Sequence, residues 1–194
     1  MTTKLLIACA LEKELTALKA RLKGDYQFLV TGLGAQKTYH TLKKYLSGAR
    51  PSLLLFTGTA GQLNPSLRLG QVVFPAEWCF QHGPCFSADI RLANTLKKQG
   101  WVIEGRGLTV RFPVLKKKSR LLLFRKFGAL ACDMESAAAL QVATEYQLSC
   151  LAPKIISDTA NFGMSKFWTE FENNMNRLAQ YLEELLEFLL LHKP

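Results

Sequence analysis

Acidic side chains stand at the ends of short apolar stretches, where several of them could take part in acid–base chemistry. Four stretches lead to a carboxylate or a glycine turn: 4–10 to Glu12 and Glu14, 52–56 to Gly58-Thr59-Ala60-Gly61, 129–132 to Asp133-Met134-Glu135, and 150–156 to Ser157-Asp158. A protonated carboxyl group can act as a general acid, whereas an ionised one can activate water or stabilise positive charge. Each residue also has an ordinary role, as a helix cap, a first-turn acid or a turn residue.

The elements that position these residues alternate between strand and helix. Runs of apolar residues predict strands at 4–10, 26–30, 52–56, 69–74, 101–110, 129–134 and 150–156. Helical spacing predicts helices at 11–22, from Gly34 to near Gly48, at 90–98, after the basic segment that begins at 115, at 136–146 and from 166 onwards. Residues 57–61 are rich in turn formers and 75–87 show no periodicity, which predicts a turn and a loop.

Uniformly apolar strands separated by amphipathic helices are typical of a mostly parallel sheet that is covered on both faces. We therefore expect an α/β fold in a single domain, residues 1–194. In such sheets ligands bind beyond the carboxyl ends of the strands. The carboxylate and glycine segments are thus expected to meet at one site.

The composition favours a compact protein with reduced thiols. Hydrophobic residues make up 48% of the chain, which argues against global disorder. Five cysteines are scattered without a Cys-x-x-Cys pair, so we expect buried, reduced thiols and neither a disulfide framework nor a metal site. No apolar stretch is long enough to cross a bilayer, and 4–10 runs directly into Glu12 without a cleavage segment. We predict a cytoplasmic protein with no membrane partner.

Basic residues outnumber acidic ones, 25 to 15, and the formal net charge is +10. Such an excess suits nucleic acid, a membrane surface or an anionic small molecule. The densest basic cluster, 115–120 followed by Arg125 and Lys126, is more simply a solvated loop and helix face. Because no nucleic-acid-binding motif accompanies it, we expect no nucleic-acid partner.

Other motifs are weak. The segment Gly32-Leu-Gly-Ala-Gln-Lys37 begins like a dinucleotide fingerprint but has Lys37 where the third Gly or Ala belongs. Residues 58–61 lack the Gly-Lys-Ser/Thr ending of a phosphate loop, and the three histidines show no triad arrangement. We therefore expect no cofactor and no serine nucleophile.

Four segments together resemble one enzyme family. Residues 10–15 and 56–73 are similar to the Ala-Met-Glu-Glu-Glu-Val and Thr-Gly-Ser-Ala-Gly-Gly segments of methylthioadenosine/S-adenosylhomocysteine nucleosidases. Residues 133–138 resemble their Glu-Met-Glu-Ala signature and 156–158 their Ile-Ser-Asp signature, in the same order. The wider superfamily includes futalosine hydrolases and nucleoside phosphorylases. The resemblance implies a three-layer α/β/α sandwich around a twisted, mixed, mostly parallel sheet.

The resemblance also implies hydrolysis of the N-glycosidic bond of a purine nucleoside. It makes Asp158 the general acid at N7 of the base, Glu135 the partner of the ribose hydroxyls, and Glu14 the group that activates water. Further substrate contacts are implied for Met134 against the sugar, Thr59, Ala60 and Gly61 along the ribose and water site, Ser157 beside the acid, and Trp168 near the 5′ substituent. The bond breaks through an oxocarbenium-like sugar, which suits carboxyl groups in different protonation states.

Three departures from the family pattern bear on the substrate. Lys154 stands where the nucleosidases have an arginine near the catalytic water, and lysine cannot make the same planar contact. Residues 110–116 replace and shorten the family's purine loop, in which Phe112 is a candidate for base stacking. The chain is also shorter than a typical nucleosidase, which suits a trimmed or opened 5′ pocket.

The substrate hypothesis follows from these departures. An acid at position 158 fits an adenine-type base, since asparagine is the usual partner of 6-oxopurines in this superfamily. The cations Arg111 and Lys116–Lys118 suit an anionic tail, such as the benzoate of futalosine and of its 6-amino analogue, aminodeoxyfutalosine. We therefore expect a futalosine-hydrolase-like enzyme of menaquinone synthesis, with methylthioadenosine/S-adenosylhomocysteine cleavage as the alternative.

Two other functions stay open, a nucleoside phosphorylase and a non-catalytic basic protein that binds nucleic acid. Hydrolysis is favoured over phosphorolysis because Glu12 and Glu14 stand where phosphorylases need a cationic, glycine-rich anion site. The family usually forms homodimers in which a partner loop completes the 5′ pocket. Residues 75–87 are the candidate for that contact in the expected homodimer.

Overall fold

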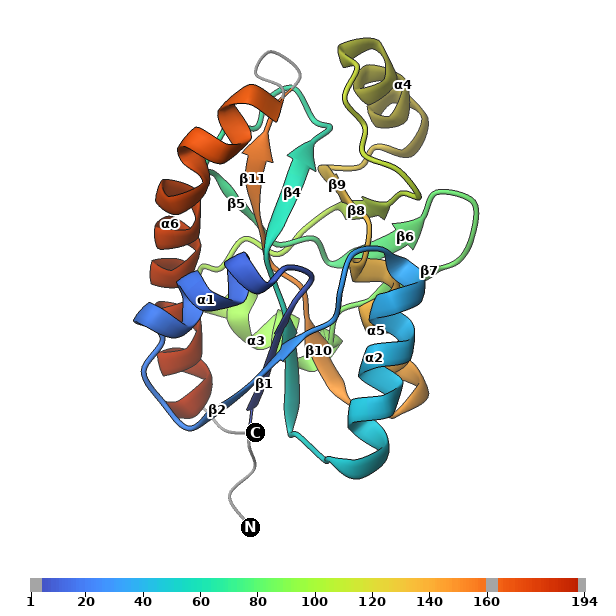
Figure 1. Ribbon diagram of the computed structural model, residues 1–194. Coiled ribbons are helices and arrows are strands. Elements are labelled where there is room, and N and C mark those ends of the chain that lie inside the picture. The colour runs from blue at the N-terminus through green and yellow to red at the C-terminus, as the bar shows by residue number, and fades with distance from the viewer. Residues whose placement is uncertain (1–4, 160–163, 192–194) are drawn as a thin grey trace.

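The structure, a computed structural model, describes residues 5–159 and 164–191 (Figure 1). Its strands are β1 Leu5–Cys9, β2 Tyr26–Val30, β3 Leu53–Phe56, β4 Thr59–Gln62, β5 Val72–Val73, β6 Glu77–Phe80, β7 Cys85–Ser87, β8 Arg106–Thr109, β9 Ala131–Asp133, β10 Ser149–Leu151 and β11 Lys154–Asp158. Its helices are α1 Glu12–Arg21, α2 Ala35–Gly48, α3 Ile90–Lys98, α4 Lys117–Phe127, α5 Ser136–Glu145 and α6 Met164–Leu191.

Backbone hydrogen bonds join the strands into two sheets. One sheet is all parallel, in the order β10-β3-β1-β2. The other has the order β5-β11-β4-β9-β8-β6-β7 and is mixed, with parallel pairs β11–β4, β8–β9 and β6–β8. Strands β3 and β10 of the first sheet continue, after short breaks, into β4 and β11 of the second.

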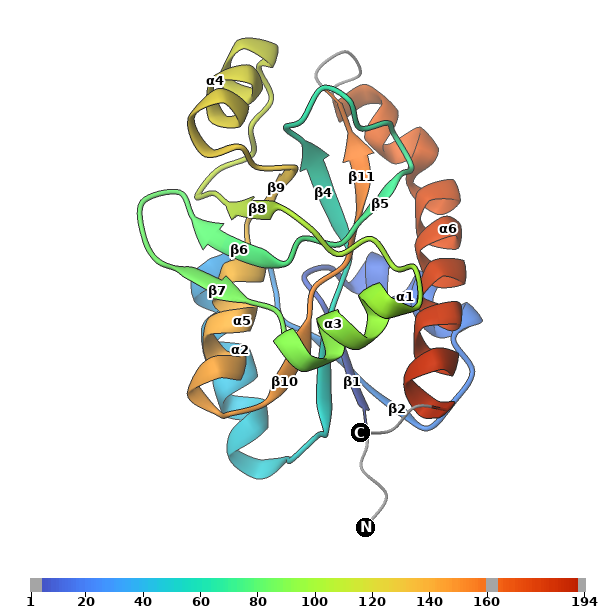
Figure 2. The same cartoon turned by 180° about the vertical axis from the view of Figure 1, so that it is seen from behind.

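Helices cover both faces of this curled sheet system. In Figure 1, α1 and α6 lie on one side of the strands and the pair α2–α5 on the other, and Figure 2 shows α3 across the back. Leu178 and Leu182 of α6 pack with Ile7 in one core cluster, while Leu42 of α2 and Leu140 of α5 belong to a second. The arrangement confirms the predicted α/β class with helices on both faces.

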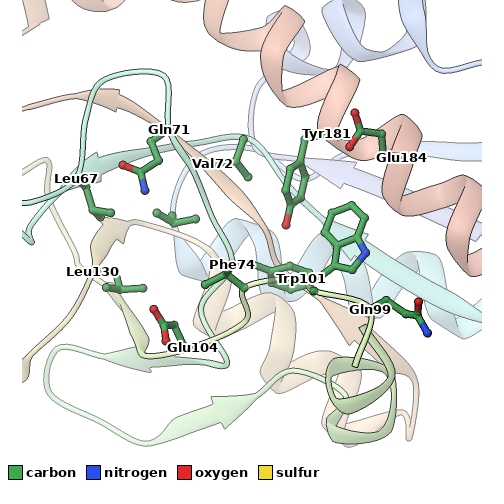
Figure 3. Close-up of a pocket in the computed structure, with 13 residues that line it drawn as sticks. Leu67, Gln71, Val72, Phe74, Gln99, Trp101, Glu104, Leu130, Tyr181 and Glu184 are labelled. Atoms are coloured by element: carbon green, nitrogen blue, oxygen red, sulfur yellow. The ribbon is translucent and has the colours of Figure 1, made fainter. Parts of the chain in front are cut away.

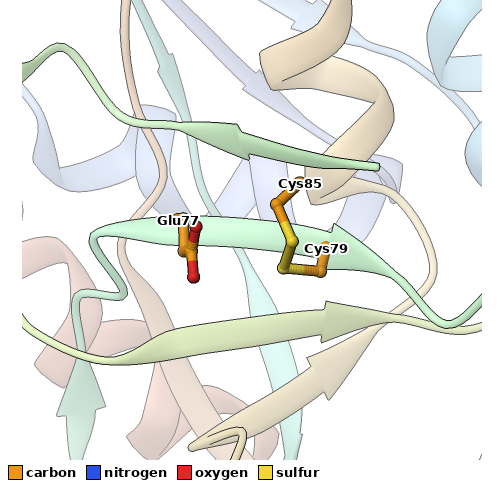
Figure 4. A group of neighbouring side chains, drawn as sticks. All are labelled: Glu77, Cys79 and Cys85. Atoms are coloured by element: carbon orange, nitrogen blue, oxygen red, sulfur yellow. A yellow bond between two sulfur atoms is a disulfide. The ribbon is translucent and has the colours of Figure 1, made fainter. Parts of the chain in front are cut away.

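Residues 75–87, predicted as a loop, form the hairpin β6–β7. Glu77 pairs with Ser87, and Cys79 pairs with Cys85. A disulfide joins those two cysteines (Figure 4), which corrects the expectation that all five thiols are reduced. The hairpin register brings the two cysteines opposite each other, a proximity that a loop assignment could not reveal. The remaining three, Cys9, Cys132 and Cys150, are free and buried, as expected.

Two other predictions were wrong at the junction of the sheets. Residues 57–61, predicted as a turn, contain β4, which pairs with β11 on one side and β9 on the other, so ladder hydrogen bonds outweigh local turn propensity. The strand predicted at 150–156 is two strands in different sheets, β10 and β11. They separate at Pro153, which has no N–H to donate to a ladder.

The strands predicted at 69–74 and 101–110 are shorter, Val72–Val73 and Arg106–Thr109. The helix at 90–98 has the predicted bounds, and its N-terminus is capped by Asp89, which accepts from the N–H groups of Arg91 and Leu92. None of the helices in the described ranges combines the length and apolar character needed to span a bilayer.

Candidate active site

Glu14 lies in the first turn of α1, directly after β1, and is buried. Its Oε1 accepts hydrogen bonds from Thr59 N at 2.9 Å and Thr59 Oγ1 at 2.7 Å, and its Oε2 accepts from Leu11 N at 3.2 Å. Glu14 therefore plays the ordinary role of a first-turn acid and also joins α1 to the start of β4. A carboxylate held in this way presents its remaining lone pairs in a fixed direction.

Gly58 leaves the space that the Glu14 carboxylate occupies. Its φ of +132° is one that side-chain-bearing residues rarely adopt, and a Cβ there would lie 2.9 Å from both carboxylate oxygens of Glu14. The glycine turn after β3 thus has a specific purpose: it allows β4 to approach the acid.

Glu135 is buried at the start of α5. Gly34 N, before α2, donates to its Oε1 at 2.7 Å, and Met134 N donates to its Oε2 at 3.1 Å. Burial, and secondarily the charge of Asp133, raise the pKa of Glu135 from 4.5 to about 7, although Lys154 and the two hydrogen bonds oppose the shift. The side chain can therefore change protonation state near neutral pH.

Asp133 is buried and contacts groups at the start of α5. It accepts from Ser136 N, from the Ser136 hydroxyl and from Thr109 Oγ1, so it caps α5 as one of its ordinary roles would require. Its Oδ2 lies 3.3 Å from Lys154 Nζ, and both side chains are 2% exposed. Lys154 also donates to Thr57 O at 3.3 Å and lies 4.3 Å from the ring centroid of Phe56. Lys154 is thus held beneath the site as the counter-ion of Asp133.

Asp158 ends β11, beside β4. A register shift between Ile156 and Asp158 brings Asp158 opposite Gly61, and Ile156 lies opposite Ala60. The Ser157 hydroxyl contacts both Ala60 O at 3.3 Å and Asp158 Oδ1 at 3.1 Å. Ala60, Gly61, Ser157 and Asp158 are therefore neighbours at these strand ends.

Arg120 of α4 is the partner of Asp158 that sequence analysis missed. Its Nη2 forms an ion pair with Asp158 Oδ2, and the two side chains are 3% and 14% exposed. The basic cluster 115–120 was interpreted as a solvated face, which is wrong for Arg120. Helical spacing places it on the same face as the partly buried Leu123, Phe124 and Phe127, and that pattern could have identified it.

Met134 and Phe112 line a cavity of about 760 Å³ next to Glu135. The cavity is also lined by residues 33–37, by Phe80 at the end of β6, by the hairpin turn 81–84 and by the end of β8. Three of its lining side chains are Lys37, His82 and Arg111. The Arg111 guanidinium lies 5.2 Å from the ring centroid of Phe112, which is 68% exposed. The cavity thus combines aromatic and basic groups beside the predicted sugar contact.

Other predicted groups lie elsewhere. Trp168 on α6 is 54% exposed and contacts Lys13, the neighbour of Glu14, with Nζ 4.8 Å from its ring. Lys116–Lys118 line two separate cavities along α4 rather than the one that contains Arg111. A further cavity of about 610 Å³, between α6, β5 and the segment after α3, is lined by Trp101 and Tyr181, and no residue predicted for the site is among its described lining (Figure 3).

Within the described residues, one group of side chains has the composition of a metal site, namely Glu77, Cys79 and Cys85 on the hairpin (Figure 4). Two of its three potential ligand atoms are the sulfur atoms of the disulfide. A disulfide sulfur is not the thiolate that binds metal, so this group does not provide a metal centre in its oxidised form.

The fold agrees with comparisons to known proteins. Residues 12–190 match the phosphorylase superfamily, and the chain belongs to that family. A 5′-methylthioadenosine/S-adenosylhomocysteine nucleosidase from Buchnera aphidicola is 22% identical over 213 residues, covering 96% of this chain and 90% of the relative.

Solved structures share the fold at lower identity. A Helicobacter pylori nucleosidase mutant with 5′-methylthioadenosine in its active site has a TM-score of 0.83 at 17% identity, covering 97% of this chain and 100% of that one. A futalosine hydrolase mutant from Helicobacter pylori has a TM-score of 0.84 at 17% identity, with the same coverage. A putative Borrelia burgdorferi nucleosidase bound to adenine has a TM-score of 0.80 at 20% identity, covering 95% and 99%.

Proposed function

We propose that this chain is a purine nucleosidase that hydrolyses the N-glycosidic bond of futalosine or aminodeoxyfutalosine, as in menaquinone synthesis. The observation that carries this proposal is the grouping of Glu14, Glu135 and Asp158 around one edge of the sheet. Glu14 and Asp158 both lie against β4, and Glu135 follows β9, which pairs with β4. Relatives of the same family act on purine nucleosides, as their names state.

In the proposed reaction water attacks C1′ of the ribose while the C1′–N9 bond breaks. Glu14, fixed by Thr59 and Leu11, accepts a proton from the water whose oxygen bonds to C1′. Glu135 holds the ribose hydroxyls as their acceptor, with Met134 against the sugar. Asp158, protonated for this step while Arg120 Nη2 donates to its Oδ2, transfers its proton to N7 as the C1′–N9 bond breaks, so that the base leaves as a neutral purine.

The 5′ substituent would occupy the cavity beside Met134, which supports a substrate with an aromatic anionic tail. Phe80 and Phe112 can pack against the ring of the tail, which replaces the base-stacking role predicted for Phe112, while Lys37 and Arg111 can pair with a carboxylate. The benzoate end of futalosine has both properties. The tail of methylthioadenosine is small and uncharged and would leave these cations without a partner from the ligand.

Neutralising the tail subsite tests this assignment. In Lys37→Gln and Arg111→Gln we expect KM for futalosine to rise about 10-fold or more, because a charged hydrogen bond contributes about 1.5–3 kcal/mol. KM for methylthioadenosine should change less than about 2-fold. Lys98→Gln, an exposed position at the end of α3, is the charge-matched control. Equal effects on both substrates would contradict the tail assignment.

Cleavage of methylthioadenosine or S-adenosylhomocysteine is the second candidate, favoured by the name of the Buchnera relative. The experiment that separates the two is base release from futalosine, aminodeoxyfutalosine and methylthioadenosine in parallel, followed by chromatography. Preference for the two futalosines supports the proposal. Preference for methylthioadenosine would make the chain a salvage nucleosidase.

A further inference from the structure

All three guanidinium nitrogens of Arg120 donate hydrogen bonds at the strand ends, although Arg120 belongs to the basic cluster 115–120. Its Nε donates to Val114 O at 2.8 Å, and its Nη1 donates to Gln62 O at 3.1 Å and Asp158 O at 3.2 Å. Its Nη2 donates to Asp158 Oδ2. These contacts fix the guanidinium plane against β4 and β11, beside the carboxyl group proposed to contact the base.

One donor of this guanidinium is not used by the described residues. A guanidinium carries five N–H groups, one on Nε and two on each terminal nitrogen. Nε and both Nη1 hydrogens have acceptors, and Nη2 has one, which leaves one Nη2 N–H without an acceptor within the described part of the chain. Because an unsatisfied donor on a buried charged group is costly, this N–H is poised to meet an acceptor on a ligand.

Whether a purine can accept a hydrogen bond from this N–H depends on N7 and on the group at position 6. A 6-oxopurine presents two acceptors side by side, N7 and O6, whereas a 6-aminopurine presents the acceptor N7 beside an N–H donor. Arginine is the side chain that most often recognises the first edge in proteins, since it can only donate. An aspartate alone at position 158 can accept a hydrogen bond from the 6-amino group and would favour a 6-aminopurine. The arginine beside it offers a donor instead, which favours the oxygen of a 6-oxopurine.

We propose that Arg120 is a specificity-determining residue that selects a 6-oxopurine, such as the hypoxanthine of futalosine, over a 6-aminopurine. This inference rests on the proposed nucleosidase function and assigns its base. Asp158 and Gly61 have a supporting part. Asp158 holds Nη2 in place, and Gly61 admits the pair, because a Cβ at Gly61 would lie 3.3 Å from Arg120 Nη1 and from Asp158 Oδ2.

A purely structural Arg120 would tie α4 to the sheet and would affect all substrates equally. The test is therefore the ratio of kcat/KM for futalosine to that for aminodeoxyfutalosine, which share a tail and differ in the group at position 6. We expect wild type to prefer futalosine by about 10-fold to 100-fold, the range for one hydrogen bond from a charged donor. In Arg120→Lys, which keeps the charge without the planar fork, the ratio should fall below about 3-fold.

Arg120→Gln, which offers an amide oxygen as an acceptor, should shift the ratio further towards the amino substrate. Arg125→Gln, an exposed position on the same helix, is the matched control and should leave the ratio unchanged. Variants that lower both rates while keeping the wild-type ratio would overturn the proposal. If the Arg120 variants do not fold, the kcat/KM ratio of the wild type alone tests the proposal. Equal kcat/KM values for the two substrates, or a preference for aminodeoxyfutalosine, would overturn the proposal.

Failure of this inference differs from failure of the proposed function. Competitive inhibition by free hypoxanthine and free adenine, or their direct binding by calorimetry, measures the base site without any tail or any reaction. Tighter binding of hypoxanthine supports the role of Arg120 even if no nucleoside is cleaved. Base release from all three nucleosides, together with tighter binding of adenine, would keep the nucleosidase and remove the proposed selection.

Discussion

Glu135 is a carboxyl group whose protonation changes near physiological pH. Its pKa rises to about 7 because burial disfavours the charged form and Asp133 adds a negative charge nearby. Only the ionised form can accept hydrogen bonds from both ribose hydroxyls with both oxygens. Ribose binding should therefore depend on pH at this residue in a way that neither an exposed glutamate nor a glutamine would show.

We predict that kcat/KM rises with pH through an apparent pKa of about 7 and is lost below it. In Glu135→Gln this acidic limb should flatten, while kcat/KM at alkaline pH falls about 10-fold to 100-fold. A pH–rate profile of both proteins is the measurement. An acidic limb that persists unchanged in the variant would assign the titration to another group.

The raised pKa of Glu135 has the opposite effect on the stability of the fold, which decreases as the pH rises. The native state binds the Glu135 proton more tightly than the unfolded chain does, so this group stabilises the fold at low pH. Its contribution decreases as the pH rises from 4.5 to about 7. Catalysis and stability thus place opposing demands on this one side chain.

At the scale of elements, the junction of β3 and β4 positions the carboxylates. The chain passes from the first sheet into the second through Thr57 and Gly58, and β4 then contacts Glu14 through Thr59 and Asp158 through Gly61. Because this connection is only two residues long, its conformation sets the position of β4 and therefore of both carboxylates.

Gly58→Ala should therefore disturb catalysis more than folding. The positive φ costs about 1–3 kcal/mol for alanine, and the new Cβ would displace the Glu14 carboxylate, for which a loss of about 10²-fold in kcat is expected. Gly48→Ala is the control, because a Cβ there meets no atom within 4 Å and its φ is unstrained. Steady-state kinetics with chemical denaturation separates the two effects, and a fully active Gly58→Ala variant would contradict the role of Glu14.

A disulfide constrains the hairpin β6–β7, which lines the cavity beside Met134. Its turn, 81–84, lines that cavity, and the disulfide between Cys79 and Cys85 closes the hairpin behind the turn. Thiol titration of the denatured, unreduced protein should detect three free thiols, those of Cys9, Cys132 and Cys150.

Reduction should raise the count to five and destabilise the fold by about 2 kcal/mol, since the closed loop is short. Cys79→Ser should behave like the reduced protein in denaturation experiments. Five free thiols before reduction would contradict the bond and agree with the reduced thiols of the predicted cytoplasmic protein.

For the whole molecule, the sequence predicted the layers because they follow from local patterns. Apolar runs and helical spacing identify α3 and α6 without tertiary information. The site of Glu14, Glu135 and Asp158 rests on the rule for strand ends and stays a prediction. The hairpin at 75–87 was missed although Gly83 and Pro84 between two short apolar runs are a turn signal.

Pairings between distant segments could not be predicted in the same way. The partners of Lys154 and Arg120 are set by how β11 and α4 meet the sheet, and neither pairing has a sequence spacing of its own. The homodimer likewise stays a prediction. The hairpin assigned to a partner's pocket lines a cavity of its own chain.

Base release in phosphate-free buffer tests the central claim, that these carboxylates catalyse hydrolysis. Wild type should release the base from a futalosine or from methylthioadenosine at a rate that added phosphate does not increase. Glu14→Gln and Asp158→Asn should each lower that rate by about 10²-fold to 10⁴-fold while the fold is retained. A rate that requires phosphate and yields a ribose 1-phosphate would make the chain a phosphorylase, and full activity in both variants would contradict the site.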